Sequence, residues 1–244
     1  MFQTIAYRFG QTIMRKYAQM LLNMEVVQHA RLPAGPRIFA ANHPTTTDPF
    51  LLLALTAAPI SILVTESCFK VPLFGHYLQT AGHIPVLQGD GRAAFDEARQ
   101  LLNEGRTIGI FPEGVLSPLE GGLCQSVCRP HTGVARLALM TGAPVIPIGI
   151  GLQPKQVWFH ELHIDGVTEM ARWYFHGKYA ITIGEPLYFE GDAENREQVR
   201  SVSDRVMDYI NRLAHESMAR VQAPQSLATH ATLTTQHTVS PSLA

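Results

Sequence analysis

The sequence predicts a single α/β domain with a mainly parallel central sheet covered by helices, preceded by an amphipathic N-terminal helix. Short apolar runs rich in β-branched residues alternate with segments of helical periodicity, which is the pattern of strands joined by helical crossovers. The length of 244 residues and the hydrophobic content of 46% suit one domain of moderate size better than two small ones. The sequence contains no internal repeat.

The N-terminal helix, which we assign to residues 1–26, has two distinct faces. Polar and basic residues fill the spaces between an apolar set at helical intervals, namely Phe2, Ile5, Phe9, Ile13, Met20, Leu21 and Met24. The first 37 residues hold five basic residues and one acidic residue, an excess that favours an anionic membrane surface. Taken alone, the pattern fits a helix packed on the domain core and an interfacial membrane anchor equally well.

The body of the domain, residues 27–221, is expected to alternate strands with helices. Strands are expected at residues 37–42, 60–66, 82–87, 106–111, 143–151, 160–165 and 179–189. Helices are expected at residues 91–105, 132–142 and 194–221, where apolar residues recur at helical spacing. Asp48-Pro49 predicts the start of another helix, with Asp48 as N-cap and Pro49 in the first helical position.

The composition of the chain excludes several classes of protein. A formal net charge of -1 gives no overall positive field that would attract nucleic acid. Three cysteines do not make a disulfide framework and point to a reducing compartment. The apolar run at residues 49–64 is interrupted by Thr56, Pro59 and Ser61, so we expect a buried helix and strand there. Residues 222–244 are rich in Thr, Ser, Gln and Pro, which predicts a disordered tail.

Two polar clusters follow predicted strands. Asn42, His43 and Asp48 come after the strand at 37–42, and Pro112-Glu113-Gly114 comes after the strand at 106–111. Because ligands of α/β sheets usually bind at the carboxyl ends of the strands, both clusters could face one cleft.

His43 and Asp48 have the chemistry of a general base and its orienting acid. A neutral imidazole can accept a proton from a hydroxyl near pH 7, provided that a carboxylate holds its other ring nitrogen. Pro44 forces a loop after His43, and a loop can bring Asp48 back to the ring. The residues alone leave the alternative open that Asp48 only caps a helix and that His43 is a strand-end histidine.

Other catalytic and metal patterns are weak. The sequence has no Gly-x-Ser-x-Gly element and no phosphate loop ending in Gly-Lys. Cys124, Cys128 and His131 do not have a common zinc spacing, so we expect no metal site.

The two strand-end clusters, taken together, resemble the motifs of the glycerolipid acyltransferase family, which includes the lysophosphatidic acid acyltransferases. Asn-His is followed by four residues and Asp (an NHX4D motif), and Phe-Pro-Glu-Gly comes about 70 positions later. Further stretches similar to the family occur in the same order, at residues 69–86, 89–114, 132–151 and 181–187. The resemblance covers roughly residues 27–190.

This resemblance implies direct acyl transfer. His43 would deprotonate an acceptor hydroxyl, which attacks the thioester of acyl-CoA or acyl carrier protein, while Asp48 orients and supports His43. The substrate-binding residues that it implies are Asn42, Lys70, Phe111, Pro112, Glu113 and Gly114. No metal or bound cofactor is needed, because the thioester is already activated. Membrane lipids are the expected partners, and the expected location is peripheral or monotopic, at the cytoplasmic face of the membrane.

The sequence departs from the family pattern where a phosphate would be recognised. Gln88 and Val115-Leu116 stand where family members that use a phosphate-bearing acceptor commonly have basic residues, and Lys70 is the best-placed substitute. A lysophospholipid such as lysophosphatidate is the first expectation for the acceptor. A phosphate-free hydroxy-lipid, a non-catalytic lipid-binding role and thioester hydrolysis are the alternatives.

Overall fold

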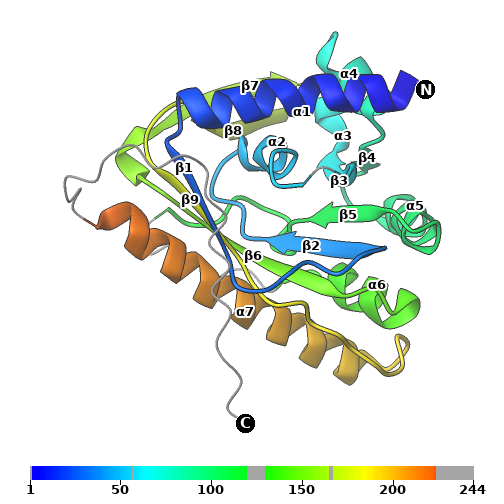
Figure 1. The fold of residues 1–244 in the computed structure, drawn as a ribbon. Coiled ribbons are helices and arrows are strands. Elements are labelled where there is room, and N and C mark those ends of the chain that lie inside the picture. The colour runs from blue at the N-terminus through cyan, green and yellow to red at the C-terminus, as the bar shows by residue number, and fades with distance from the viewer. Residues whose placement is uncertain (1, 57, 120–129, 165–166, 224–244) are drawn as a thin grey trace.

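A seven-stranded sheet with the order β1-β9-β6-β2-β5-β3-β4 forms the centre of the structure (Figure 1). Its strands are β1 (Met24–Gln28), β2 (Arg37–Ala41), β3 (Ile60–Thr65), β4 (Ile84–Val86), β5 (Thr107–Ile110), β6 (Val145–Leu152) and β9 (Tyr179–Ile183). All neighbours run parallel except β6 and β9, which are antiparallel. The expected mainly parallel α/β sheet is therefore confirmed. The structure is a computed structural model that describes residues 2–56, 58–119, 130–164 and 167–223.

Helices cover both faces of the sheet (Figure 1). They are α1 (Phe2–Met20), α2 (Asp48–Leu52), α3 (Glu66–Phe69), α4 (Phe74–Ala81), α5 (Arg92–Asn103), α6 (Gly133–Thr141) and α7 (Arg196–Gln222), with one 3-10 turn, η1 (Pro154–Gln156). α1 and α2 lie on one face, and α6 and α7 lie on the other. The helices expected from apolar periodicity at 91–105, 132–142 and 194–221 are all present, with ends shifted by a few residues.

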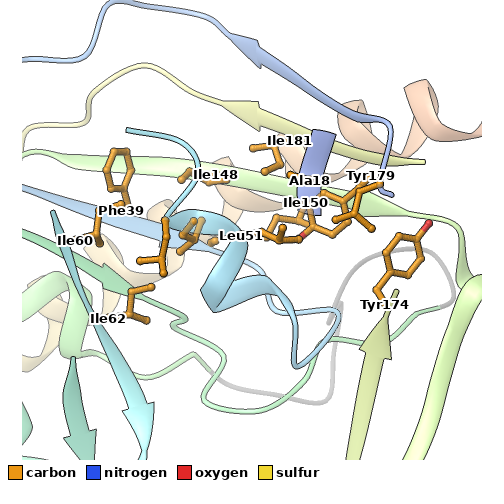
Figure 2. Packing of buried hydrophobic residues seen from close by; sticks show 14 of the residues in the cluster. Ala18, Phe39, Leu51, Ile60, Ile62, Ile148, Ile150, Tyr174, Tyr179 and Ile181 are labelled. Atoms are coloured by element: carbon orange, nitrogen blue, oxygen red, sulfur yellow. The ribbon is translucent and has the colours of Figure 1, made fainter. Parts of the chain in front are cut away.

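Strand alternation divides the core into two clusters. Phe39 and Ala41 of β2 point to the cluster beneath α1 and α2, whereas Ile38 and Ala40 point to the cluster beneath α5, α6 and α7. Figure 2 shows the first cluster, in which Leu51 of α2 packs against the sheet. Each fully buried aliphatic side chain of this kind stabilises the fold by about 1.5–3 kcal/mol. The apolar run at 49–64 contributes α2 and β3 to this core, as predicted.

α7 lies very close to β6. A Cβ atom on Gly149 would stand 2.0 Å from the backbone of Leu213, and one on Gly151 would stand 2.5 Å from the backbone nitrogen of Met218. The Gly-Ile-Gly sequence therefore permits close helix–strand packing.

α1 packs on the domain through one face and exposes the other. Tyr7, Gln11 and Ala18 are buried, and the Gln11 amide donates to the carbonyls of Leu53 and Thr56 at 2.9 and 2.6 Å. The exposed face carries four members of the predicted apolar set, Ile5, Phe9, Ile13 and Met20. Across the described part of the chain, no helix is long and apolar enough to cross a bilayer.

Several features lie outside the sequence prediction. β1 spans the boundary drawn after residue 26 and joins the sheet edge beside β9. β7 (Val157–Ile164) pairs antiparallel with β8 (Val167–Tyr174) in a separate two-stranded sheet, and only β7 was expected. The predicted tail falls, apart from its first two residues, outside the described part of the chain.

Candidate active site

The two predicted polar clusters meet at one edge of the sheet. β2 and β5 are neighbouring parallel strands, with Arg37 opposite Thr107 and Ala40 opposite Ile110. The loops that follow them therefore leave the sheet side by side, and the His43 carbonyl accepts a 2.7 Å hydrogen bond from the Ser117 backbone N–H. The convergence predicted from strand ends is confirmed.

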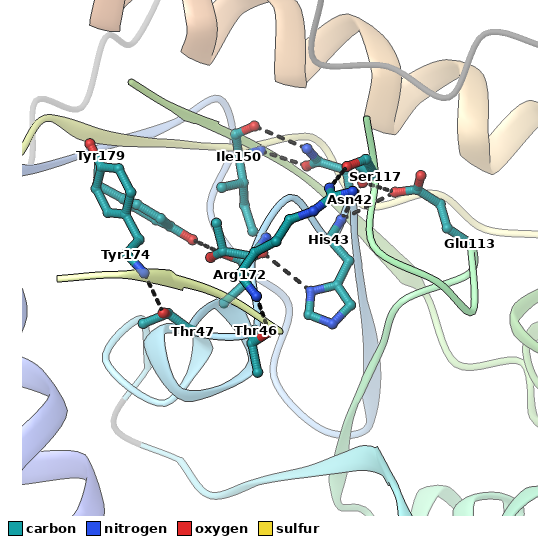
Figure 3. A network of polar contacts seen from close by, with 12 residues as sticks. Asn42, His43, Thr46, Thr47, Glu113, Ser117, Ile150, Arg172, Tyr174 and Tyr179 are labelled. Atoms are coloured by element: carbon teal, nitrogen blue, oxygen red, sulfur yellow. Dashed lines mark hydrogen bonds and ion pairs between the residues drawn. The ribbon is translucent and has the colours of Figure 1, made fainter. Parts of the chain in front are cut away.

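His43 and Asp48 form a hydrogen-bonded pair. Nδ1 of His43 lies 3.2 Å from Oδ2 of Asp48 (Figure 3). The Asp48 side chain is 0% exposed and the His43 side chain 18% exposed, so the acid is enclosed while the ring reaches the surface. An ionised carboxylate only accepts hydrogen bonds, so it holds the imidazole proton on Nδ1 and leaves the Nε2 lone pair free to accept another proton.

Three further groups fix the Asp48 carboxylate. The backbone N–H and hydroxyl of Thr45 donate to Oδ2 and Oδ1, each at 2.6 Å, and the Tyr179 hydroxyl donates to Oδ1 at 2.8 Å. Burial raises the pKa of Tyr179 well above its usual value, and the Asp48 charge adds to the shift, so the phenol remains a donor. Thr45 and Tyr179 were not identified from the sequence.

The prediction that Asp48 caps α2 is wrong. Thr47 is the N-cap residue, Asp48 lies in the first helical turn, and no side chain makes a capping hydrogen bond. Both oxygens of Asp48 are instead directed to His43, Thr45 and Tyr179. The carboxylate therefore orients the imidazole and has no capping role.

Glu113 joins the two loops from a buried position. Its side chain is 4% exposed, and Oε1 accepts hydrogen bonds from the His43 backbone N–H at 3.1 Å and from the Ser117 hydroxyl. Burial raises the pKa of Glu113, and the hydrogen bonds from Ser117 and His43 oppose that shift. Oε2 is buried without a hydrogen-bond partner among the described residues. Glu113 therefore links the His43 backbone to the Ser117 side chain.

The remaining residues of the Phe-Pro-Glu-Gly motif shape the site around the imidazole. The Phe111 ring stacks on the His43 ring with centroids 4.3 Å apart. The Pro112 carbonyl accepts a 2.8 Å hydrogen bond from the His131 N–H. Gly114 has a φ of +68°, and a Cβ there would stand 2.4 Å from the His131 ring, so only glycine fits.

Asn42 has its amide occupied by the sheet. Its Nδ2 donates to the Ile150 carbonyl at 3.0 Å, and its Oδ1 accepts from the Ile150 N–H at 2.7 Å. Asn42 therefore ties the end of β2 to β6 and fixes the start of the loop that carries His43. A direct substrate contact would require its amide to leave Ile150.

Lys70 pairs with a carboxylate of α3. Lys70 follows the last turn of α3 and lies 3.9 Å from Glu66. Cys124 and Cys128 lie outside the described residues. Within the described ranges, no group of three or more His, Cys, Asp or Glu side chains could hold a metal ion.

The β7–β8 hairpin supplies contacts that sequence reasoning missed. The Arg172 N–H donates to the Thr46 hydroxyl at 3.0 Å, and the Thr46 N–H donates to the Arg172 carbonyl at 2.8 Å. The Arg172 guanidinium donates to the Ser117 carbonyl, and the Tyr174 N–H donates to the Thr47 hydroxyl at 3.0 Å. No local motif marks these residues, because they are more than 50 positions from their partners.

Comparison with known proteins agrees with the motifs. The acyltransferase family model matches residues 23–151, more than half of the chain. The chain is 32% identical over 114 residues to a 1-acyl-sn-glycerol-3-phosphate acyltransferase of Borreliella burgdorferi, covering 46% of this chain and 44% of that one. It is 32% identical over 131 residues to a lyso-ornithine lipid O-acyltransferase of Pseudomonas aeruginosa, covering 53% of this chain and 48% of that one.

A solved structure supports the fold over most of the chain. The crystal structure of the 1-acyl-sn-glycerophosphate acyltransferase of Thermotoga maritima matches with a TM-score of 0.57 and 23% identity, covering 92% of this chain and 81% of that chain. The chain spans about half the length of the curated relatives that it matches. The family model covers more than half of the chain, and the ordered motifs and the fold agree with it: the chain belongs to the acyltransferase family.

Proposed function

We propose that this protein transfers a fatty acyl group from a thioester to the hydroxyl of a lysolipid, with His43 as general base and Asp48 as its support. The observation that carries the proposal is the 3.2 Å contact between His43 Nδ1 and the buried Asp48 carboxylate. This contact leaves Nε2 as the basic nitrogen, on a ring that reaches the surface.

The reaction needs one proton carrier and an oriented acceptor. His43 Nε2 takes the hydroxyl proton while the hydroxyl oxygen forms a bond to the thioester carbonyl carbon. The carbon–sulfur bond then breaks, and the proton passes from His43 to the departing sulfur, so the products are an ester and a free thiol. Asp48 stabilises the imidazolium between these two proton transfers. Acyl-CoA or acyl carrier protein is the proposed donor, and the scheme requires no metal or bound cofactor.

Helix α1 is the proposed membrane contact. Phe9 and Met20 are 66% and 79% exposed, and they share their face with Ile5 and Ile13. α1 contains three basic residues, Arg8, Arg15 and Lys16, and no acidic residue. An exposed apolar row accompanied by positive charge fits the surface of an anionic bilayer, from which a lysolipid would reach the site.

Lysophosphatidate is the first acceptor that we propose, because two of the relatives named above act on 1-acylglycerol phosphates. A lyso-ornithine lipid is the second candidate. The Pseudomonas aeruginosa relative, which acts on this lipid, favours it. So do Val115 and Leu116, because they are apolar where a basic residue would recognise a phosphate.

An acceptor panel tests this proposal. The purified protein is given acyl-CoA or acyl carrier protein with lysophosphatidate, lyso-ornithine lipid or no acceptor, and both ester formation and thiol release are measured. Acceptor-dependent ester formation is the expected result. Thiol release at the full rate without acceptor would identify a hydrolase, and the absence of both products would identify a lipid-binding relative.

A further inference from the structure

Arg172 of the β7–β8 hairpin is joined to both catalytic loops. Its backbone pairs with Thr46, which lies between His43 and Asp48 in the chain, and its guanidinium donates to the Ser117 carbonyl. Ser117 in turn donates its hydroxyl to Glu113. Figure 3 shows the Arg172 side chain running from the hairpin across the catalytic loop toward Ser117. The hairpin therefore brings a permanent positive charge to the edge of the site.

The guanidinium has bonding capacity that the described residues do not use. Arginine has five N–H donors, and among the described residues the hydrogen-bond acceptor of this side chain is the Ser117 carbonyl. Nε is buried without a partner among the described residues. A half-buried guanidinium beside a general base is suited to a bidentate contact with an anionic group.

Apolar residues lie on the same face of the hairpin as Arg172. Phe159 pairs directly with Arg172 across the strands, and Met170 is two residues before Arg172 on β8, so all three project to one side. Val157 and Tyr174 continue this face into the buried core, which fixes it as the side toward the domain. Phe159 and Met170 are 57% and 49% exposed beside the cation, and Glu161, which pairs with Met170, places an exposed carboxylate at the far end of the same face.

We infer that this face of the hairpin binds the acceptor: Arg172 contacts an anionic headgroup, and Phe159 and Met170 contact the acyl chain. The inference rests on the proposed function and names the acceptor class as a single-chain hydroxy-lipid with a phosphate monoester or a carboxylate. A cation adjoining an exposed apolar strip complements such a molecule in both charge and polarity. Arg172 would then supply, from a separate element, the basic group that Val115-Leu116 do not provide.

Substitutions at Arg172 test the headgroup contact. Arg172→Gln is expected to raise the KM for the anionic acceptor by about 10- to 100-fold, the range for loss of a charge-assisted hydrogen bond, with the KM for the acyl donor unchanged. Arg172→Lys should recover part of the loss, because it keeps the charge but not the planar fork of donors. Arg99→Gln, on the exposed side of α5, is the matched control and should leave both KM values unchanged.

Three acceptors separate the sources of the negative charge: lysophosphatidate, a hydroxy-lipid with a carboxylate headgroup, and neutral monoacylglycerol. The parent protein should favour one of the anionic acceptors, and Arg172→Gln should lower transfer to that acceptor by a larger factor than transfer to monoacylglycerol. The anionic acceptor that loses more identifies the headgroup. An equal loss with monoacylglycerol, or an equal rise in the donor KM, would overturn the inference.

Phe159→Ser tests the chain contact without touching the catalytic loops. The expected result is a higher KM for long-chain acceptors and little change for short-chain ones; a change independent of chain length would contradict the assignment.

This variant also decides the inference if Arg172→Gln does not fold, as judged by thermal unfolding. If the parent transfers acyl groups but neither variant changes the acceptor KM, the inference fails while the proposed function stands. If the parent transfers to none of the acceptors, both fail.

Discussion

The loops that carry His43 and Glu113 differ from the outer surface of α1 in how their side chains are paired or covered. Around Asp48, a fully buried carboxylate has hydrogen bonds from His43, Thr45 and Tyr179. On α1, apolar side chains such as Phe9 remain exposed to solvent. A buried charge requires complete pairing to be tolerated, and an exposed apolar row is stabilised only by a partner that covers it. The polar groups around Asp48 are therefore paired within the chain, whereas the apolar row of α1 is the surface that we propose a membrane covers.

The two regions lie on the same side of the molecule. α1 packs on the face of the sheet that carries α2, and α2 begins at Asp48. Tyr17 of α1 donates to the carbonyl of Tyr174, the residue whose N–H binds Thr47 of the catalytic loop. A membrane held by α1 would thus lie near the loops that carry His43. The proposed chemistry and the proposed membrane contact are supported by one shared framework.

The largest expected effect comes from removing the His43 imidazole, the proposed general base. His43→Ala is expected to lower kcat by about 10²- to 10⁴-fold, because no other group takes the hydroxyl proton. The variant should still fold, with a thermal unfolding midpoint lowered by the loss of one hydrogen bond to Asp48 and of the stacking on Phe111. His215→Ala, at an exposed position on α7, is the control. A variant that turns over as fast as the parent would exclude His43 as the base.

Polar substitutions on the outer face of α1 test the membrane contact. Ile5→Ser, Phe9→Ser and Ile13→Ser together should lower binding to vesicles containing anionic lipid by on the order of 100-fold, at about 1 kcal/mol per side chain. Co-sedimentation measures this, with circular dichroism to show that α1 is intact. Substitution is a sharper test than deletion, because α1 also buries Tyr7 and Ala18 in the core. Undiminished vesicle binding would assign the contact to another surface.

Removing the Tyr179 hydroxyl tests whether the buried pairing of Asp48 matters. Tyr179→Phe should lower the free energy of unfolding by about 1–3 kcal/mol, because one bond to a buried carboxylate is lost. Activity should fall by up to about tenfold, since Thr45 still holds Asp48. Tyr188→Phe, on an exposed tyrosine, is the matched control. Equal stability of the two variants in chemical denaturation would mean that the bond contributes nothing.

The smallest expected effect concerns the pH dependence of stability through Glu113. Burial raises its folded-state pKa above 4.5, so its favourable contribution is present below pH 4.5 and is lost as pH rises through the folded pKa. Glu113→Gln cannot ionise. The stability of the parent relative to this variant should therefore fall as pH rises from 4.5 and then level off. Urea unfolding from pH 4 to 7 measures this difference, and a constant or rising difference would contradict the assigned shift.

The sequence predicted the parallel sheet, the helices that cover it and the edge of the sheet where the site lies. Alternating apolar runs and helical segments specify a parallel sheet, because each strand and each helix must bury its own apolar face. The ends of β2 and β5 bring His43 and Glu113 together because neighbouring parallel strands end at the same edge. Apolar periodicity also gave the buried face of α5, which consists of Ala94, Ala98, Leu101 and Leu102.

The tertiary structure alone decided which groups complete the site and which surface remains uncovered. Tyr179 reaches Asp48 across 131 positions, and Arg172 reaches Thr46 across 126. No local spacing marks such contacts, because they depend on the order of strands in space. The role of Asp48 also depended on the tertiary structure. Its sequence neighbours predicted a helix cap, but the buried carboxylate accepts four hydrogen bonds from His43, Thr45 and Tyr179. The sequence did not show which side of α1 faces the core. In the structure Tyr7, Gln11 and Ala18 pack against the domain, so the apolar row on the opposite side is exposed.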